Sequence, residues 1–257
     1  MTQPTPTSIT APSGADAATT VRMEAAGLAA LAHALEDSTG LGGAFAAAMA
    51  ILLPLPGRVV VTGIGKSGHI ARKIQATLAS TGTPSLFVHP AEASHGDLGM
   101  IQPGDAILAF SNSGETTELA DIAAHARSSK LPLLAVTSRA DSTLAAAATV
   151  AMILPAMPEA CPMGLAPTTS TLCQLAFGDA LAVALLRQRG FTAADFSTFH
   201  PGGRLGARLR TVRELMRTGA AMPLATPLAP LVDWSMATTR NALGRVPGSH
   251  PHLPLSP

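Results

Sequence analysis

The fold of this chain is decided by the stretch Val59-Val60-Val61-Thr62-Gly63-Ile64-Gly65-Lys66-Ser67-Gly68-His69-Ile70-Ala71-Arg72-Lys73. It opens with β-branched residues, passes through a turn that contains several glycines and continues with helical spacing. This pattern is typical of a buried parallel strand that leads into a helix through a turn of the size of a phosphate group. We therefore expect the ligand of this protein to bind at this turn.

Strand-like and helical segments alternate along most of the chain. The predicted strands are 58–62, 85–88, 105–110, 131–137 and 150–154, and the predicted helices are 21–33, 45–53, a segment ending near 79, 117–129, 144–148 and 169–186. This alternation predicts an α/β fold: a doubly wound, mostly parallel five-stranded sheet with helices on both faces, preceded by N-terminal lead-in helices. In such sheets, ligands bind beyond the carboxyl ends of the strands.

A second polar loop, Ser111-Asn112-Ser113-Gly114-Glu115-Thr116, directly follows the third predicted strand. It supplies hydroxyl groups and backbone amides ahead of a predicted helix, and these groups suit a phosphate dianion. The first turn adds the charge of Lys66 and the hydroxyl of Ser67. Two such loops at neighbouring strand ends predict one phosphorylated small-molecule ligand.

Taken alone, the first turn allows other interpretations. Gly63-x-Gly65-x-x-Gly68 fits the dinucleotide fingerprint, but the end of the second predicted strand carries Val88, His89 and Pro90 where an acidic residue should hold the ribose. A Walker loop would need a glycine at the position of Val60. In a third interpretation, the glycines only allow the helix to pack closely against the strand.

Composition narrows the class of protein. The chain has 257 residues, of which 47% are hydrophobic, and its formal net charge is +1, with basic residues mostly scattered singly. It can therefore bury a globular core, and it lacks the basic stripe of a nucleic-acid-binding protein. Cys161 and Cys173 have neither metal-binding nor disulfide-framework spacing, which fits a reducing cytoplasm.

The ends of the chain differ in composition from its middle. Residues 1–20 contain several prolines and no Lys or Arg, so we expect a disordered tail and no signal peptide. The longest apolar stretch, 41–55, is too short to cross a bilayer, and no membrane segment is expected. Beyond Gly219, repeated prolines predict a linker with at most one helix, ending in disorder.

The loops GIGKSG (63–68) and SNSGET (111–116) resemble those of the sugar isomerase (SIS) domain. The wider string resembles arabinose 5-phosphate isomerases through FVHPAEASHGDLGMI (87–101), EACPMGLAPTTSTL (159–172), GDALAVALL (178–186) and GFTAADFSTFHPGGRLG (190–206). The resemblance implies interconversion of D-ribulose 5-phosphate and D-arabinose 5-phosphate, the precursor of the lipopolysaccharide sugar Kdo. It also implies an SIS domain over 21–212. Family members usually continue into two tandem CBS modules, so 213–257 is expected to be a linker and a remnant of the first.

The resemblance also implies which residues form the site. Residues that match catalytically relevant positions are Lys66, Glu118, Glu159 and His200. Residues that match sugar-phosphate contacts are Gly82, Thr83, His89, His95 and the loop with Ser111, Asn112, Ser113 and Thr116. In related enzymes a histidine such as His200 comes from a neighbouring subunit, which implies a homo-oligomer, either a dimer or a tetramer.

Isomerisation of an aldose to a ketose needs a base that moves a carbon-bound proton, an acid that moves a hydroxyl proton, and stabilisation of the enediolate. The candidate residues suffice for this without a cofactor or metal. Our hypothesis is that Glu118 or His200 removes the proton, that Glu159 and His95 assist ring opening or proton transfer, and that Lys66 steadies the oxyanion or phosphate. The sequence leaves the individual roles open.

Each candidate also has a structural explanation. Glu118 would favour the start of a helix without any catalytic role, and His200 before Pro201 could be a turn residue. His89 and His95 could form part of a metal pair, but no third ligand is near, so at most an incidental or inhibitory zinc is expected at His89. Cys161 is expected to pack rather than to act as a nucleophile.

Two other functions compete with this one. A non-catalytic sugar-phosphate regulator would use the same loops, but such regulators usually carry a helix-turn-helix module ahead of the domain, and residues 1–20 are too short for one. An isomerase for a different phosphosugar is the other alternative, since the loops recognise the phosphate and not the sugar. The stretches HPAEASHGD (89–97) and HPGG (200–203) favour the arabinose 5-phosphate branch.

Overall fold

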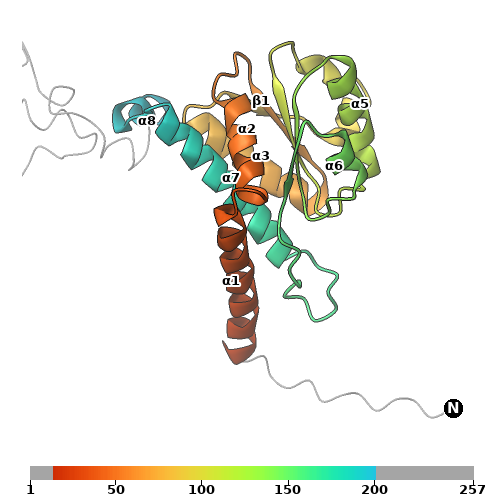
Figure 1. Ribbon diagram of the computed structural model, residues 1–257, viewed down its shortest axis with the longest axis vertical. Helices are drawn as coiled ribbons and strands as arrows, with labels where there is room; N and C mark the ends of the chain where they lie inside the picture. The colour runs from red at the N-terminus through yellow and green to blue at the C-terminus, as the bar shows by residue number, and fades with distance from the viewer. Residues whose placement is uncertain (1–13, 201–257) are drawn as a thin grey trace, which may run out of the picture. The chain divides into compact units, whose positions relative to one another are not determined.

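The computed structural model describes residues 14–200 and places a parallel sheet between two layers of helices (Figure 1). The strands are β1 (Val59–Gly63), β2 (Ser85–Phe87), β3 (Ala106–Phe110), β4 (Leu133–Thr137) and β5 (Val150–Ile153). The helices are α1 (Gly14–Glu36), α2 (Leu41–Leu52), α3 (Gly65–Ser80), α4 (Pro90–Ala93), α5 (Ala120–Ser128), α6 (Thr143–Ala147), α7 (Thr169–Gln188) and α8 (Ala193–Phe199), with one-turn 3₁₀ helices η1 (Asp97–Met100) and η2 (Thr117–Leu119). The predicted α/β fold with a five-stranded sheet and N-terminal helices is confirmed.

All strand pairs are parallel, and the strand order is β2-β1-β3-β4-β5. Every residue of β1, β3 and β4 is buried, which explains why these strands are apolar runs without alternation. The order reverses between β1 and β3, because β2 lies on one side of β1 and β3 on the other. This is the topological switch point, where doubly wound sheets bind ligands.

Two hydrophobic cores lie on opposite faces of the sheet. One contains Val59, Val61 and Leu108 together with residues of α2, α3 and α7, among them Ile74 and Phe177. The other packs the alternate strand residues, such as Val60 and Ile107, against α4, α5 and α6. Both faces are therefore covered, and the strand ends carry the loops that remain available for ligands.

The N-terminal boundary differs from the prediction. Helix α1 begins at Gly14, so residues 14–20, expected to belong to a disordered tail, are helical. Ala15, Ala17 and Ala18 are strong helix formers, and Asp16 lies in the first turn, where an acidic side chain is favourable. The predicted linker and CBS remnant at 213–257, and residues 1–13 of the tail, lie outside the described residues.

Among the described residues, one helix, α7, is long and apolar enough to cross a membrane as judged by length and composition. Its residues Phe177, Leu181 and Leu185 are fully buried in the core that α3 and α2 share. A Cβ on Gly178 would meet the side chain of Ile74 at 2.3 Å, so α7 and α3 are in very close contact. Burial on this scale is typical of a core helix in a globular domain.

Candidate active site

A pocket of about 350 Å³ lies between the ends of β1 and β3, at the switch point of the sheet. Its lining includes Lys66 and Ser67 from the start of α3, and Ser111, Asn112, Ser113 and Thr116 from the loop after β3. Ile64, Phe110 and Pro167 complete its lining. The two loops that the sequence singled out therefore face one cavity, which we call the phosphate pocket.

The glycine turn that carries Lys66 is shaped by two different requirements. Gly65 has φ +58, a left-handed conformation that disfavours other residues. A Cβ on Gly68 would lie 2.6 Å from the Gly63 carbonyl oxygen, so this glycine does allow the close packing of helix on strand that the sequence left open. Packing and ligand binding are compatible here, because Lys66 projects from the same turn and is exposed.

Lys66 makes no ion pair or hydrogen bond through its side chain with any residue in the described range 14–200. The N–H groups of the first turn of α3, which have no partners within the helix, lie next to it. A cation beside free backbone donors at a helix start favours an anion.

The loop from Ser111 to Thr116 is ordered by its own hydroxyl groups. Ser111 Oγ and Thr116 Oγ1 lie 2.7 Å apart, and Ser111 Oγ also accepts a 3.0 Å hydrogen bond from the Gly114 amide. The amide of Glu115 donates to Ser113 Oγ at 3.2 Å. Among residues 14–200, no partner takes one hydroxyl hydrogen of the Ser111–Thr116 pair or that of Ser113, so both can be donated to a ligand.

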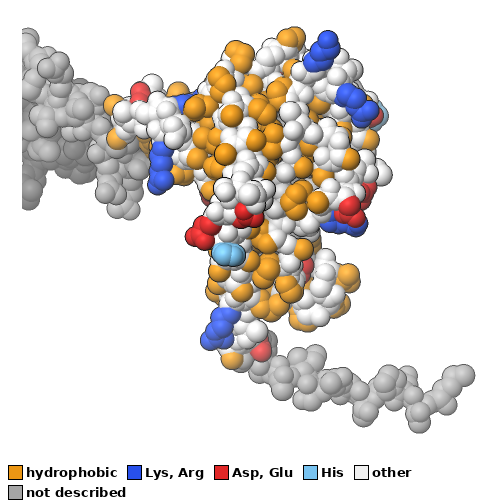
Figure 2. All heavy atoms as spheres, in the orientation of Figure 1, with side chains coloured by type: hydrophobic (Ala, Val, Ile, Leu, Met, Phe, Trp, Pro, Cys, Tyr) orange, Lys and Arg blue, Asp and Glu red, His pale blue; other side chains and the backbone are white. Residues whose placement is uncertain are grey.

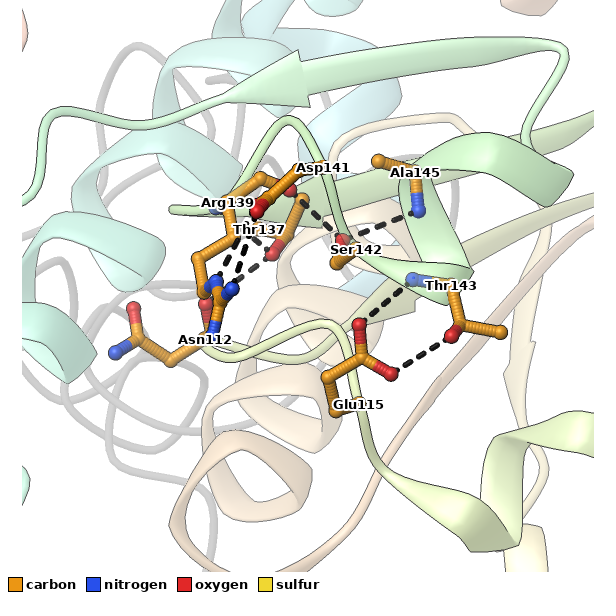
Figure 3. A network of polar contacts seen from close by, with 8 residues as sticks. All are labelled: Asn112, Glu115, Thr137, Arg139, Asp141, Ser142, Thr143 and Ala145. Carbon is orange, nitrogen blue, oxygen red and sulfur yellow. Dashed lines mark hydrogen bonds and ion pairs between the residues drawn. The ribbon is translucent and has the colours of Figure 1, made fainter.

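Contacts with the neighbouring strand and helix hold the loop from behind (Figure 3). Glu115 accepts hydrogen bonds from the Thr143 amide at 2.9 Å and the Thr143 hydroxyl at 2.7 Å, and the Thr143 hydroxyl is the main reason why the pKa of Glu115 lies below its ordinary value. The Asn112 carbonyl accepts from Thr137 Oγ1 at 3.1 Å. Glu115 is therefore an anchor for the loop.

Glu159 lies in the segment that connects β5 to α7, and its carboxylate receives four hydrogen bonds. Oε2 accepts from the Thr168 amide at 2.7 Å, from the Thr168 hydroxyl at 3.1 Å and from the Ser170 amide at 3.2 Å, and Oε1 accepts from the Ser170 hydroxyl. Burial alone would raise the pKa of Glu159, but the hydrogen bonds from Ser170 and Thr168 outweigh it and lower the pKa below its ordinary value.

Glu159 and its neighbours line a second, wider cavity of about 1030 Å³. The cavity runs along residues 157–164 and the first turns of α1, and Asn112 belongs to both this cavity and the phosphate pocket. We call it the wide groove. A ligand with its phosphate in the phosphate pocket could extend past Asn112 into the wide groove.

Three further predicted residues come after the strands β2 and β3 in the chain, but none of them lines the phosphate pocket or the wide groove. His89 and His95 follow β2, and Glu118 lies in η2 after the Ser111–Thr116 loop. Glu118 and His95 are exposed, whereas His89 is partly buried and its Nδ1 has no hydrogen-bond partner in the described chain. Within residues 14–200, no group of three or more His, Cys, Asp or Glu residues could hold a metal ion.

Gly82 and Thr83 are not brought to this site within one chain. They precede β2 and therefore lie at the amino edge of the sheet, opposite the phosphate pocket. There the guanidinium of Arg189 donates to the Gly82 carbonyl at 3.1 Å, and a Cβ on Gly82 would strike the ring of Phe191. A single subunit thus keeps these two residues apart from the phosphate pocket, and their contact with a sugar phosphate stays a prediction.

His200 is the last described residue and belongs to a second compact unit, which begins after Phe199. The structure consequently neither places His200 in the phosphate pocket nor separates it from the pocket. Its predicted role remains a prediction.

Sequence reasoning gave no role to Thr168, Ser170 and Pro167, which hold Glu159 or line the phosphate pocket. They lie in the stretch EACPMGLAPTTSTL, which contributed to the prediction only through its resemblance. The available signal was a glutamate shortly before a run of Thr and Ser at the start of a long helix, since hydroxyl and acidic residues gather at such helix starts.

Residues 53–184 match the model of the SIS domain. Arabinose 5-phosphate isomerase KdsD of Escherichia coli (strain K12) is 52% identical over 189 residues, which cover 73% of this chain and 58% of that protein. The protein of the same name from Pseudomonas aeruginosa is 50% identical over 205 residues, covering 79% of this chain and 63% of that protein. The chain thus spans less than two thirds of the length of these relatives.

Among solved structures, that of E. coli CFT073 c3406 in complex with arabinose 5-phosphate superposes with a TM-score of 0.67. It is 38% identical in sequence, and the match covers 74% of this chain and all of that chain.

Proposed function

Because the chain belongs to the SIS domain family, we propose that it is an aldose–ketose isomerase that interconverts D-ribulose 5-phosphate and D-arabinose 5-phosphate. The observation that carries the proposal is the phosphate pocket, in which Lys66 and the hydroxyl loop face one cavity at the switch point. The names of the KdsD relatives and the arabinose 5-phosphate complex of c3406 support the choice of sugar.

The proposed reaction moves protons and no other group. A base takes the proton from the carbon next to the carbonyl, and the resulting enediolate is protonated on the neighbouring carbon while a hydroxyl proton shifts between the two oxygens. Glu118 or His200 serves as the base, His95 assists, and Lys66 stabilises the phosphate or the enediolate oxygen. No cofactor or metal is required for these steps.

A homo-oligomer is part of the proposal. Met163 and Leu165, at the wide groove and next to it, are 75% and 77% exposed, and α1 presents Val21 and Met23 to solvent. Figure 2 shows apolar side chains along α1 on this face of the molecule. A second copy, in a dimer or tetramer, would cover such a surface and supply His200 to its neighbour. The protein would act in the cytoplasm and supply arabinose 5-phosphate for Kdo and lipopolysaccharide synthesis.

The test is to incubate the purified chain with ribulose 5-phosphate in D₂O and to follow the products by NMR. Formation of arabinose 5-phosphate, with deuterium entering the carbon-bound position, is the expected result. If the chain binds the sugar phosphate but neither exchanges the carbon-bound proton for deuterium nor forms product, the isomerase proposal is wrong and a sugar-phosphate-binding regulator is the better explanation. Formation of another pentose or hexose phosphate from a panel of substrates would retain the isomerase and change its sugar.

A further inference from the structure

Glu159 has the surroundings of a structural anchor. Both carboxylate oxygens accept hydrogen bonds, and Oε2 alone accepts from the Thr168 amide, the Thr168 hydroxyl and the Ser170 amide. The two amides can only donate, so a proton on Oε2 would face an N–H group with no acceptor between them, which disfavours the protonated form. An anchored, ionised carboxylate of this kind satisfies the free N–H groups at the start of α7.

The same contacts close a loop. Glu159 and Thr168 are held together, and the Ala160 amide adds a 2.8 Å hydrogen bond to the Thr168 hydroxyl. Residues between these two positions line the wide groove, and Pro167, directly before Thr168, lines the phosphate pocket. One carboxylate thus fixes a segment that forms part of the wall of both cavities.

We propose that Glu159 is a positioning residue that holds the segment 157–168 against the first turn of α7 and so keeps the wide groove aligned with the phosphate pocket, and that it carries no proton in the reaction. The role in alignment rests on the proposed isomerase function. The anchoring of the segment does not, and can be measured separately.

Three substitutions at Glu159 separate anchoring from proton transfer. In Glu159→Gln, the amide oxygen can still accept from the Thr168 and Ser170 amides, but the side chain cannot titrate. In Glu159→Asp, the side chain can titrate, but it is one methylene shorter and cannot reach the same donors. Glu159→Ala removes both properties. Glu92→Ala is the matched control, because Glu92 is exposed and its side chain makes no hydrogen bond or ion pair among residues 14–200.

The readouts are steady-state kinetics and hydrogen–deuterium exchange of the peptide amides in 157–170. A positioning role predicts that Glu159→Gln keeps kcat within about tenfold of the unsubstituted chain and retains both limbs of its pH profile. Glu159→Asp and Glu159→Ala are expected to raise KM by about tenfold or more and to exchange faster in 157–170, with Glu92→Ala unchanged.

The opposite order overturns the proposal. If Glu159→Asp is more active than Glu159→Gln, or if Glu159→Gln loses about a hundredfold or more in kcat with unchanged exchange in 157–170, the carboxylate transfers a proton. Failure of Glu159→Gln to fold would also contradict the proposal, since the remaining amide oxygen should suffice as an anchor. If the unsubstituted chain shows no isomerase turnover, the proposed function is wrong. The order of the hydrogen–deuterium exchange rates in 157–170 among the variants still tests whether Glu159 anchors this segment.

Discussion

Gly114 lies so close to Ser142 that a Cβ on Gly114 would fall 2.1 Å from Ser142 Oγ. The backbone of Gly114 also has φ +68, which disfavours any other residue. This contact packs the Ser111–Thr116 loop against the start of α6, where Ser142 accepts a hydrogen bond from the Ala145 amide (Figure 3). The geometry of the phosphate pocket therefore depends on a residue that has no side chain.

Gly114→Ala is expected to displace the loop. The added methyl group and the strained backbone should lower the free energy of unfolding by about 1–3 kcal/mol and raise KM for the sugar phosphate by about tenfold. Urea unfolding and steady-state kinetics measure the two effects. Gly99→Ala is the control, because a Cβ at Gly99 would meet nothing within 4 Å. If Gly114→Ala and Gly99→Ala have the same free energy of unfolding and the same KM, the loop accommodates a methyl group at Gly114 and the prediction is wrong.

Lys66→Ala should lower kcat/KM by about a hundredfold or more, because it removes the cation that lines the phosphate pocket. Its thermal midpoint should stay unchanged, since Lys66 is exposed and its side chain bonds to no residue between 14 and 200. Lys130→Asn is the matched control: it removes another lysine charge, and asparagine tolerates the φ of +55 at that position. A Lys66→Ala enzyme as active as this control would exclude Lys66 from the mechanism.

If a neighbouring subunit supplies His200, two inactive variants should complement each other. Mixed oligomers of Lys66→Ala and His200→Ala chains would contain some sites with both residues intact, and random exchange in a dimer predicts roughly a quarter of the activity of the unsubstituted protein. Native mass spectrometry verifies that the chains have exchanged. Absence of any recovered activity after verified exchange would argue for a site built within one chain.

The Asp105–Arg58 pair should make stability depend on pH in the acid range. The Asp105 carboxyl is 2% exposed and accepts from the Arg58 guanidinium at 3.0 Å, from the Arg58 amide at 2.7 Å and from the Gln102 amide at 2.9 Å. Burial would raise the pKa of Asp105, but these hydrogen bonds, first that of the Arg58 side chain, outweigh it and lower the pKa below its ordinary value.

Because the pKa is lower in the folded chain than in the unfolded chain, the stabilisation is complete above the unfolded pKa of about 3.9 and is lost as pH falls through the folded pKa. We expect Asp105→Asn to lower the free energy of unfolding by about 2–3 kcal/mol at pH 6, and the difference to shrink toward pH 3. Urea unfolding at pH 6, 4 and 3 measures it. A difference that stays constant over this range would show that the charge of Asp105 does not stabilise the fold.

Local sequence patterns predicted most of the scaffold. The strands β1, β3 and β4 were recognisable because both faces of the sheet are covered, which forces uninterrupted apolar runs. The order of the strands was not predictable in this way, because it depends on which strands pair across long stretches of chain. The start of α1 was missed because residues 14–20 carry no apolar stripe and follow a proline-rich segment.

The site shows the same division. The hydroxyl loop after β3 could be predicted from composition, whereas the anchor of Glu115 on Thr143 joins residues 28 positions apart and leaves no local pattern. The anchor of Glu159 on Thr168 lies within one connection, between β5 and α7, and its only local signal is a glutamate shortly before the run of Thr and Ser that opens α7. The position of Gly82 was deducible, because residues that precede a parallel strand lie at its amino edge. The family resemblance assigns Gly82 to the sugar-phosphate contacts, but it does not show at which edge of the sheet Gly82 lies in a single subunit.

The hydrogen bonds within the Ser111–Thr116 loop have a consequence for the thermodynamics of binding. Since Ser111, Thr116 and Gly114 bond to one another within the loop, a phosphate would meet a loop whose conformational entropy has been lost during folding. Association would then be limited by diffusion and desolvation rather than by ordering of the loop. Liganded and unliganded forms should superpose closely along these six residues, and the heat capacity change of binding should reflect only the surface that the sugar buries.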